Sequence, residues 1–108
     1  MTTLELPQRD LQELLSILRT HVPQAEIWAY GSRVSGRAHE ASDLDLVLRN
    51  PANPAIPMTG LPALREALSE SRLPILVDVQ DWARIPATFR REIEQAHVVL
   101  IGQPDEAG

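Results

Sequence analysis

The stretch IWAYGSRVSGRAHEASDLDLVL, from Ile27 to Leu48, decides how the rest of the chain can fold. It predicts a strand, a glycine-serine turn into a short helix, a polar loop and a second strand that carries Asp43 and Asp45. Side chains alternate along a strand, so the two aspartates share one face and the leucines that follow them take the other. One face of the second strand is therefore expected to lie in a core, while the other holds the acids.

Asp43 and Asp45 need a counter-charge. Two residues of strand place their carboxylates about 6 to 7 Å apart, and at an effective dielectric constant of about 20 the repulsion is roughly 2 to 3 kcal/mol. The chain contains no lysine, and the arginines nearest to the acids are Arg37 and Arg49. A divalent cation is the economical counter-charge, and a set of oxygen ligands suits Mg²⁺.

Length and composition restrict the classes of protein to consider. The 108 residues suffice for a single domain, expected over 1-102, with a flexible C-terminal tail at 103-108. Ten basic and fifteen acidic residues give a net charge of −5, which disfavours binding to duplex nucleic acid. Cysteine is absent, which excludes disulfides and thiolate metal sites. No apolar run approaches the roughly 20 residues that span a bilayer, and we expect a cytoplasmic protein without membrane contact.

The remaining elements alternate between helices and strands. Apolar periodicity predicts helices at about 7–21, at 61–71 and around Ile85, Phe89 and Ile93, and strands at 25–30, 75–80 and 98–101. This order predicts an α+β fold, in which a small mixed β-sheet is flanked by helices in a two-layer arrangement. Prolines spaced by three predict an extended, polyproline-like loop between the second strand and the helix that follows.

Asp78 interrupts the apolar run ILVDVQ, which is otherwise typical of a strand. Counting by two, it shares a face with Leu76 and Gln80. An acid inside an apolar strand does not serve packing, so Asp78 is a candidate third carboxylate beside Asp43 and Asp45.

The turn Tyr30-Gly31-Ser32-Arg33 could hold an anion. Glycine permits close approach of a ligand, the following helix start offers N–H groups, and Arg33 and Arg37 could add positive charge. Taken alone, Gly-Ser is more typical of a turn, and the distal residues of a Walker A loop are absent. The spacing adds weight, because Gly-Ser, ten intervening residues and Asp-x-Asp arise by chance about once in a thousand chains of this length.

These positions, Gly31-Ser32 followed by Asp43-x-Asp45, resemble the signature of the DNA polymerase β-like nucleotidyltransferase superfamily. The short chain resembles its minimal nucleotidyltransferase (MNT) branch, which supplies the antitoxin of HEPN/MNT toxin-antitoxin systems. The resemblance implies a Mg²⁺-dependent transfer of AMP from ATP by in-line displacement at the α-phosphate. The implied nucleotide-binding residues are Gly31, Ser32 and Arg33, and the implied metal-binding and catalytic residues are Asp43, Asp45 and Asp78.

The resemblance also implies a partner. Larger relatives carry an additional domain for the acceptor, whereas in the minimal branch a separate, all-helical HEPN toxin takes that role and in some systems receives AMP on a tyrosine. We therefore expect a hetero-oligomer with a HEPN-domain toxin. Two alternatives stay open: a non-catalytic antitoxin that acts by occlusion, and a nucleotidyltransferase that modifies a small molecule such as an aminoglycoside.

Other conspicuous residues have plainer interpretations. Trp28 and Trp82 could stack a base, but such residues are more often part of a core. Tyr30 is either a packing residue or itself a modified site. The histidines fit no zinc spacing: His21, His39 and His97. Only His39, in the loop before the acids, could approach a substrate.

Overall fold

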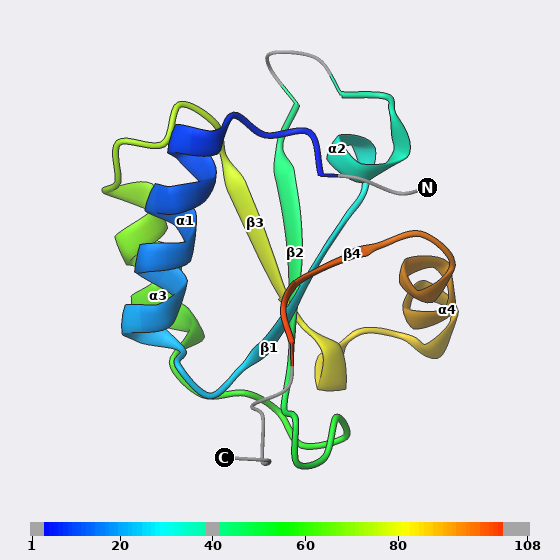
Figure 1. Cartoon of the computed structure of the whole chain (residues 1–108). Helices are drawn as coiled ribbons and strands as arrows, with labels where there is room; N and C mark the ends of the chain where they lie inside the picture. Colours follow the sequence, from blue (N-terminus) through cyan, green and yellow to red (C-terminus); the bar gives the residue numbers. More distant parts are fainter. Residues whose placement is uncertain (1–3, 39–41, 103–108) are drawn as a thin grey trace.

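The computed structural model of the protein describes residues 4–38 and 42–102. Within them the chain runs α1 (Gln8–His21), β1 (Glu26–Tyr30), α2 (Ser32–Ser35), β2 (Leu44–Arg49), α3 (Leu61–Ser69), β3 (Val77–Asp81), the 3-10 helix η1 (Trp82–Arg84), α4 (Ala87–Gln95) and β4 (Val98–Ile101) (Figure 1). The predicted order of helices and strands is confirmed, and η1 is an addition to it. His39 and the predicted tail at 103-108 lie outside the described residues.

The strands form one sheet in the order β3-β2-β1-β4. The central pair, β1 and β2, is antiparallel, β4 is antiparallel to β1, and β3 is parallel to β2. The predicted mixed sheet is therefore confirmed. Asp43 directly precedes β2 and is not part of it, so the second strand begins one residue later than expected.

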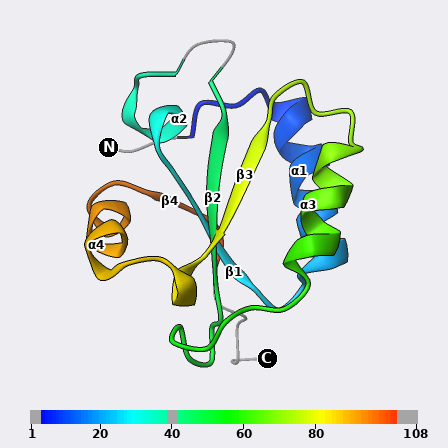
Figure 2. The ribbon, with the colours of Figure 1, turned by 180° about the vertical axis from the view of Figure 1, so that it is seen from behind.

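Helices lie on both faces of the sheet. Figures 1 and 2 show α1 and α3 side by side on one face and α4 on the other. The predicted two-layer arrangement is thus extended by α4, which adds a partial third layer. Beneath α1 and α3 lies a core cluster that includes Leu14, Leu18, Ile27, Ala29, Leu44, Leu46, Leu48, Leu64 and Val79. Beneath α4 lies a smaller cluster of Trp28, Tyr30, Val47, Trp82, Ile85 and Ile93.

Local sequence explains where the helices begin and end. Pro7 occupies the N-cap position of α1, where its missing N–H costs nothing, and the chain leaves the helix before Pro23. Gly60 precedes α3 with a φ of 85°, a value that glycine adopts without strain. Among the described residues, no helix is long and apolar enough to cross a membrane.

The proline-rich connection is irregular, as predicted, but it is not a continuous extended segment. The side chain of Asn50 accepts hydrogen bonds from the N–H groups of Ala52 and Asn53, and Asn53 accepts from Ala55. Such Asx turns bend the chain, because the side chain replaces the next peptide as an acceptor. The polyproline-like prediction was therefore wrong in detail: asparagines between the prolines set the shape.

Candidate active site

Three side chains form a row across the strands on the face that α4 partly covers. Tyr30 at the end of β1 pairs with Asp45 of β2, and Asp45 pairs with Asp78 of β3. Side chains of directly opposed residues project from the same face and lie about 4.5 to 5.5 Å apart at Cβ. The register thus brings together two of the predicted carboxylates and a phenol.

The acids at this end of the sheet are open to solvent to different degrees. Asp43 and Asp78 are exposed, whereas Asp45 is half-buried. Gln80, two residues along β3, donates a hydrogen bond from Nε2 to Oδ2 of Asp78 at 3.1 Å. Within the described residues, no arginine or histidine forms an ion pair with any of the three acids.

This crowding of negative charge shifts the ionisation of the middle residues of the row. Burial raises the pKa of Asp45 above its ordinary value, and the charges of Asp78 and then Asp43 raise it further. Burial also raises the pKa of Tyr30, with further contributions from Asp45 and Asp78. The phenol therefore stays protonated and able to donate a hydrogen bond, and the carboxylates lack a counter-charge.

A divalent cation fits this donor set. Within residues 4–38 and 42–102, no group of three or more His, Cys, Asp or Glu side chains forms a ready-made metal cluster. Magnesium commonly binds through one or two carboxylates together with substrate phosphates and water. The elevated pKa of Asp45 marks the position where a cation would relieve the repulsion from Asp78 and Asp43.

Gly31 connects the row to the turn that follows β1. Its φ of 82° and ψ of −155° lie in a region that is essentially reserved for glycine. A Cβ atom at this position would overlap Oδ2 of Asp45. Both the backbone conformation and the carboxylate therefore require glycine here, and Ser32 follows it as the first residue of α2.

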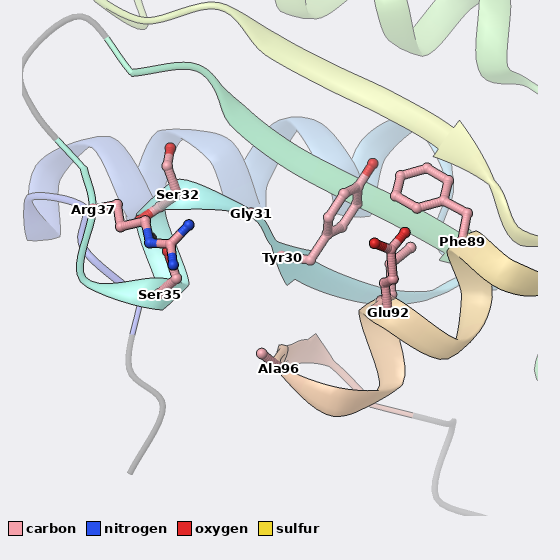
Figure 3. A pocket seen from close by; sticks show the side chains of 9 residues that line it. Tyr30, Gly31, Ser32, Ser35, Arg37, Phe89, Glu92 and Ala96 are labelled. Atoms are coloured by element: carbon pink, nitrogen blue, oxygen red, sulfur yellow. Dashed lines mark hydrogen bonds between the residues drawn. The ribbon is translucent and has the colours of Figure 1, made fainter.

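A cavity of about 460 Å³ opens beside this turn. Figure 3 shows Arg37 and the serines of α2 on one side, α4 on the other, and Tyr30 between them. The ring of Tyr30 packs edge-on against Phe89, with centroids 5.6 Å apart. The lining residues are Tyr30, Gly31, Ser32, Ser35, Arg37, Phe89, Glu92, Ile93 and Ala96.

Comparisons with known proteins agree with this geometry. Residues 12–106 match the family described as "Polymerase beta, Nucleotidyltransferase". The chain belongs to this family. A relative from Haemophilus influenzae, named "Probable protein adenylyltransferase MntA", is 38% identical over 97 residues, which cover 90% of this chain and 83% of that protein.

The fold of this nucleotidyltransferase also matches a solved structure. A chain from a structure described as "Crystal structure of the toxin-antitoxin with AMP-PNP" has a TM-score of 0.69 and 22% identity. The match covers 86% of the present chain and 73% of that chain. At this identity the likeness establishes the polymerase β-like α+β fold, as predicted.

Arg33, a predicted nucleotide contact, binds main-chain carbonyls in the structure. It is buried, its Nε donates to the carbonyl of Ser42 at 3.0 Å, and its Nη1 donates to the carbonyl of Glu5 at 2.9 Å. Arg33 does not line the cavity beside Gly31, whereas Arg37 does. In the nucleotidyltransferase, Arg33 thus joins α2 to the segment that leads into the acidic pair.

Several cavity residues of the nucleotidyltransferase carried no functional signal in the sequence. Phe89, Glu92 and Ala96 belong to α4, where helical periodicity indicated only packing and a solvated outer side. Nothing in the local sequence states that α4 folds back over the end of β1. Only the tertiary structure brings these residues to the glycine-serine turn.

The aromatic residues away from the cavity pack as a cluster. Trp28 stacks on His97 with centroids 4.0 Å apart and meets Trp82 edge-on at 5.3 Å. The guanidinium of Arg49 lies over both tryptophans and forms a 2.8 Å ion pair with Glu26. The interpretation of both tryptophans as core residues is confirmed, and His97 has a helix-end position near the carbonyl of Ile93.

Proposed function

We propose that this nucleotidyltransferase is a Mg²⁺-dependent protein adenylyltransferase that acts as a cytoplasmic antitoxin, transferring AMP from ATP to a HEPN-type toxin and thereby neutralising it. The observation that carries the proposal is the row of Tyr30, Asp45 and Asp78, because Tyr30 also lines the cavity that holds Gly31 and Ser32. The name of the Haemophilus relative supports AMP transfer to protein. The toxin-antitoxin neighbour, bound to AMP-PNP, supports the partner and the nucleotide.

The nucleotide is assigned to the cavity beside Gly31. Its volume of about 460 Å³ lies within the range of small-ligand sites. Gly31 and Ser32 present main-chain groups and a hydroxyl to the triphosphate, and Arg37, which lines the same cavity, adds positive charge. The apolar surfaces of Tyr30 and Phe89 leave room for the rest of the nucleotide.

The three carboxylates have two proposed roles, metal binding and proton acceptance. Asp43, Asp45 and Asp78 would hold Mg²⁺, which would neutralise charge on the triphosphate. Asp78 lies at the open edge of the row, and it accepts the proton of the incoming hydroxyl. The hydroxyl oxygen forms a bond to the α-phosphorus, the bond from that phosphorus to the α,β-bridging oxygen breaks, and pyrophosphate leaves.

The proposal is tested with ATP labelled at the α-phosphate, Mg²⁺ and a HEPN-type toxin subunit co-expressed with this chain. We expect label on the toxin, and we expect Asp45→Asn to reduce the transfer at least about 100-fold, because a lost metal ligand removes several kcal/mol of charge stabilisation. The matched variant Asp10→Asn, in the first turn of α1, should transfer label normally.

Three results would contradict the proposal. Neutralisation of the toxin at full potency by Asp45→Asn would favour occlusion without catalysis. Label on an aminoglycoside and none on the toxin would favour a small-molecule acceptor. Transfer of label from the γ-phosphate would exclude nucleotidyl transfer.

A further inference from the structure

The outer edge of β3 is unpaired within the described residues, because β3 is the first strand of the order β3-β2-β1-β4. The N–H of Leu44 donates to the carbonyl of Leu76 at 2.9 Å, so the polar groups of Leu76 face β2. Directions alternate along a strand, which turns the polar groups of Val77 and Val79 outward. Arg65 confirms this, since its Nη2 donates to the carbonyl of Val79 from α3 at 2.8 Å.

An exposed leucine marks the same edge. Leu76 is 75% exposed, more than Val99 at 50% and Ile56 at 48%, the other exposed large hydrophobic residues of the described chain. Leu76 precedes Asp78 by two residues and therefore shares its face of the sheet. A groove of about 260 Å³ lies on the other side of this edge, between α3 and the segment that leads into β3. Leu76 directly precedes β3, so an exposed leucine and Asp78 lie two residues apart at this edge.

A further strand at this edge would continue the row of side chains that crosses the sheet. Tyr30, Asp45 and Asp78 occupy the same level on three neighbouring strands. A further strand would lie about 4.8 Å beyond β3, and a residue on it opposite Asp78 would have its Cβ about 4.5 to 5.5 Å away. A hydroxyl side chain at that position would meet the proposed proton acceptor.

We propose that the outer edge of β3 receives an extended segment of the acceptor protein, which pairs with the outward groups of Val77 and the outward N–H of Val79 and presents its hydroxyl residue beside Asp78. The inference rests on the proposed function and names how the protein substrate is held. An apolar residue two positions from the hydroxyl packs on Leu76. The net charge of −5 favours basic residues in the same segment, which gives the occupant its charge complementarity.

This mode of binding uses main-chain hydrogen bonds for affinity and alternate side chains for selection. Arg65 caps one outward carbonyl and leaves the part of the edge nearer to Leu76 open. The acceptor segment is therefore expected to align from Leu76 to Asp78 and to extend no further than the N–H of Val79. A small molecule without an extended backbone could not form these main-chain hydrogen bonds and would gain no affinity from this edge.

The test compares Leu76→Thr with Val99→Thr and Ile56→Thr, which remove exposed hydrophobic residues elsewhere. The acceptor is the HEPN-type toxin subunit, and label from the α-phosphate of ATP is followed. We expect Leu76→Thr to lower kcat/KM for the toxin about tenfold, mainly through KM, because one buried leucine contact is lost. Binding of a fluorescent ATP analogue should not change, and both control variants should stay within about twofold of the wild type.

Hydrogen exchange supplies a second measurement that does not depend on transfer. The amides of Val77 and Val79 should become protected when the toxin subunit binds, while the amides of β4 at the opposite edge should not. Equal kinetics of Leu76→Thr and Val99→Thr, or no protection at Val77, would overturn the docking. A concentration-dependent dimer of this chain that Leu76→Thr abolishes would also overturn it. Protection without any label transfer would support the docking and overturn the proposed function.

Discussion

The two faces of β2 are used for different purposes. Leu44, Leu46 and Leu48 point into the core beneath α1 and α3 and are fully buried. On the other face, Val47 is equally buried beneath α4, but Asp45 lies beyond the cover of that helix and is only half-buried. One strand therefore contributes folding energy along one whole face and carries a proposed catalytic carboxylate at one end of the other.

This difference shows how a small nucleotidyltransferase can tolerate an unfavourable group of charges. The core face buries aliphatic surface without polar groups to satisfy, which is the main favourable contribution to folding. The acids stand at a rim where water still reaches Asp43 and Asp78. Substitutions on the core face should thus lower stability, whereas substitutions of the acids should lower activity.

The largest effect on stability is expected for Leu46→Ala. Leu46 has no exposed surface, and truncation of such a leucine costs about 2 to 5 kcal/mol through lost burial and the cavity left behind. Unfolding in urea, followed by circular dichroism, measures the loss. Leu76→Ala is the matched control, because a 75% exposed leucine should change stability by less than about 0.5 kcal/mol. Equal losses for the two leucines would remove the distinction between the faces.

Arg33→Met should give the next largest loss. Two hydrogen bonds from a buried guanidinium to the carbonyls of Glu5 and Ser42 disappear, and we expect about 2 to 3 kcal/mol of destabilisation. Arg37→Met is the control at the cavity: it should leave urea unfolding nearly unchanged and weaken binding of ATP. The reverse pattern, in which Arg33→Met unfolds normally and binds ATP poorly, would restore the role that the sequence predicted for Arg33.

Gly31→Ala and Gly36→Ala separate backbone strain from steric overlap. Both glycines have a φ of 82°, so each substitution should cost about 1 to 2 kcal/mol of stability. A Cβ at Gly36 meets nothing within 4 Å, whereas one at Gly31 overlaps the carboxylate of Asp45. We therefore expect AMP transfer to fall at least about tenfold more for Gly31→Ala than for Gly36→Ala, because Asp45 must move. Transfer assays at matched folded fractions measure this ratio, and equal activities would show that the overlap has no consequence.

Much of the fold could be predicted from the sequence because its elements are locally encoded. Alternation placed the leucines and Asp45 of β2 on opposite faces, and helical spacing located α1, α3 and α4. The mixed direction of the strands followed from the order of elements. The register between β1, β2 and β3 is set by contacts between distant segments. The alignment of Tyr30, Asp45 and Asp78 therefore emerged only from the structure.

The candidate site was predictable where a motif records it and not elsewhere. Gly31, Ser32 and the aspartates stand at a spacing that the chemistry constrains. Arg33 shows the limit of such reasoning, since a charge beside a phosphate turn looks the same in sequence whether it faces a ligand or a carbonyl. The contribution of α4 to the cavity depends on where a distant helix packs, which no local pattern states.

The smallest expected effect is a change in Tm that measures the charge repulsion among Asp43, Asp45 and Asp78. The pKa of Asp45 is raised in the folded protein above its ordinary 3.8, so its charge opposes folding at neutral pH and not below pH 3.8. In the presence of EDTA, Asp45→Asn should therefore raise Tm at pH 7, and this gain should shrink as the pH falls toward 4.

Neighbouring substitutions sharpen the same measurement. Asp78→Asn and Asp43→Asn remove only the charges that act on Asp45, and they should give smaller gains in that order, because Asp78 contributes more than Asp43. Adding Mg²⁺ with ATP should reverse the sign, since the wild type then gains ligand stabilisation that the variants lose. A Tm of metal-free Asp45→Asn below that of the wild type at pH 7 would show that this carboxylate supports the fold as the leucines do, and the division between the two faces of β2 would not hold.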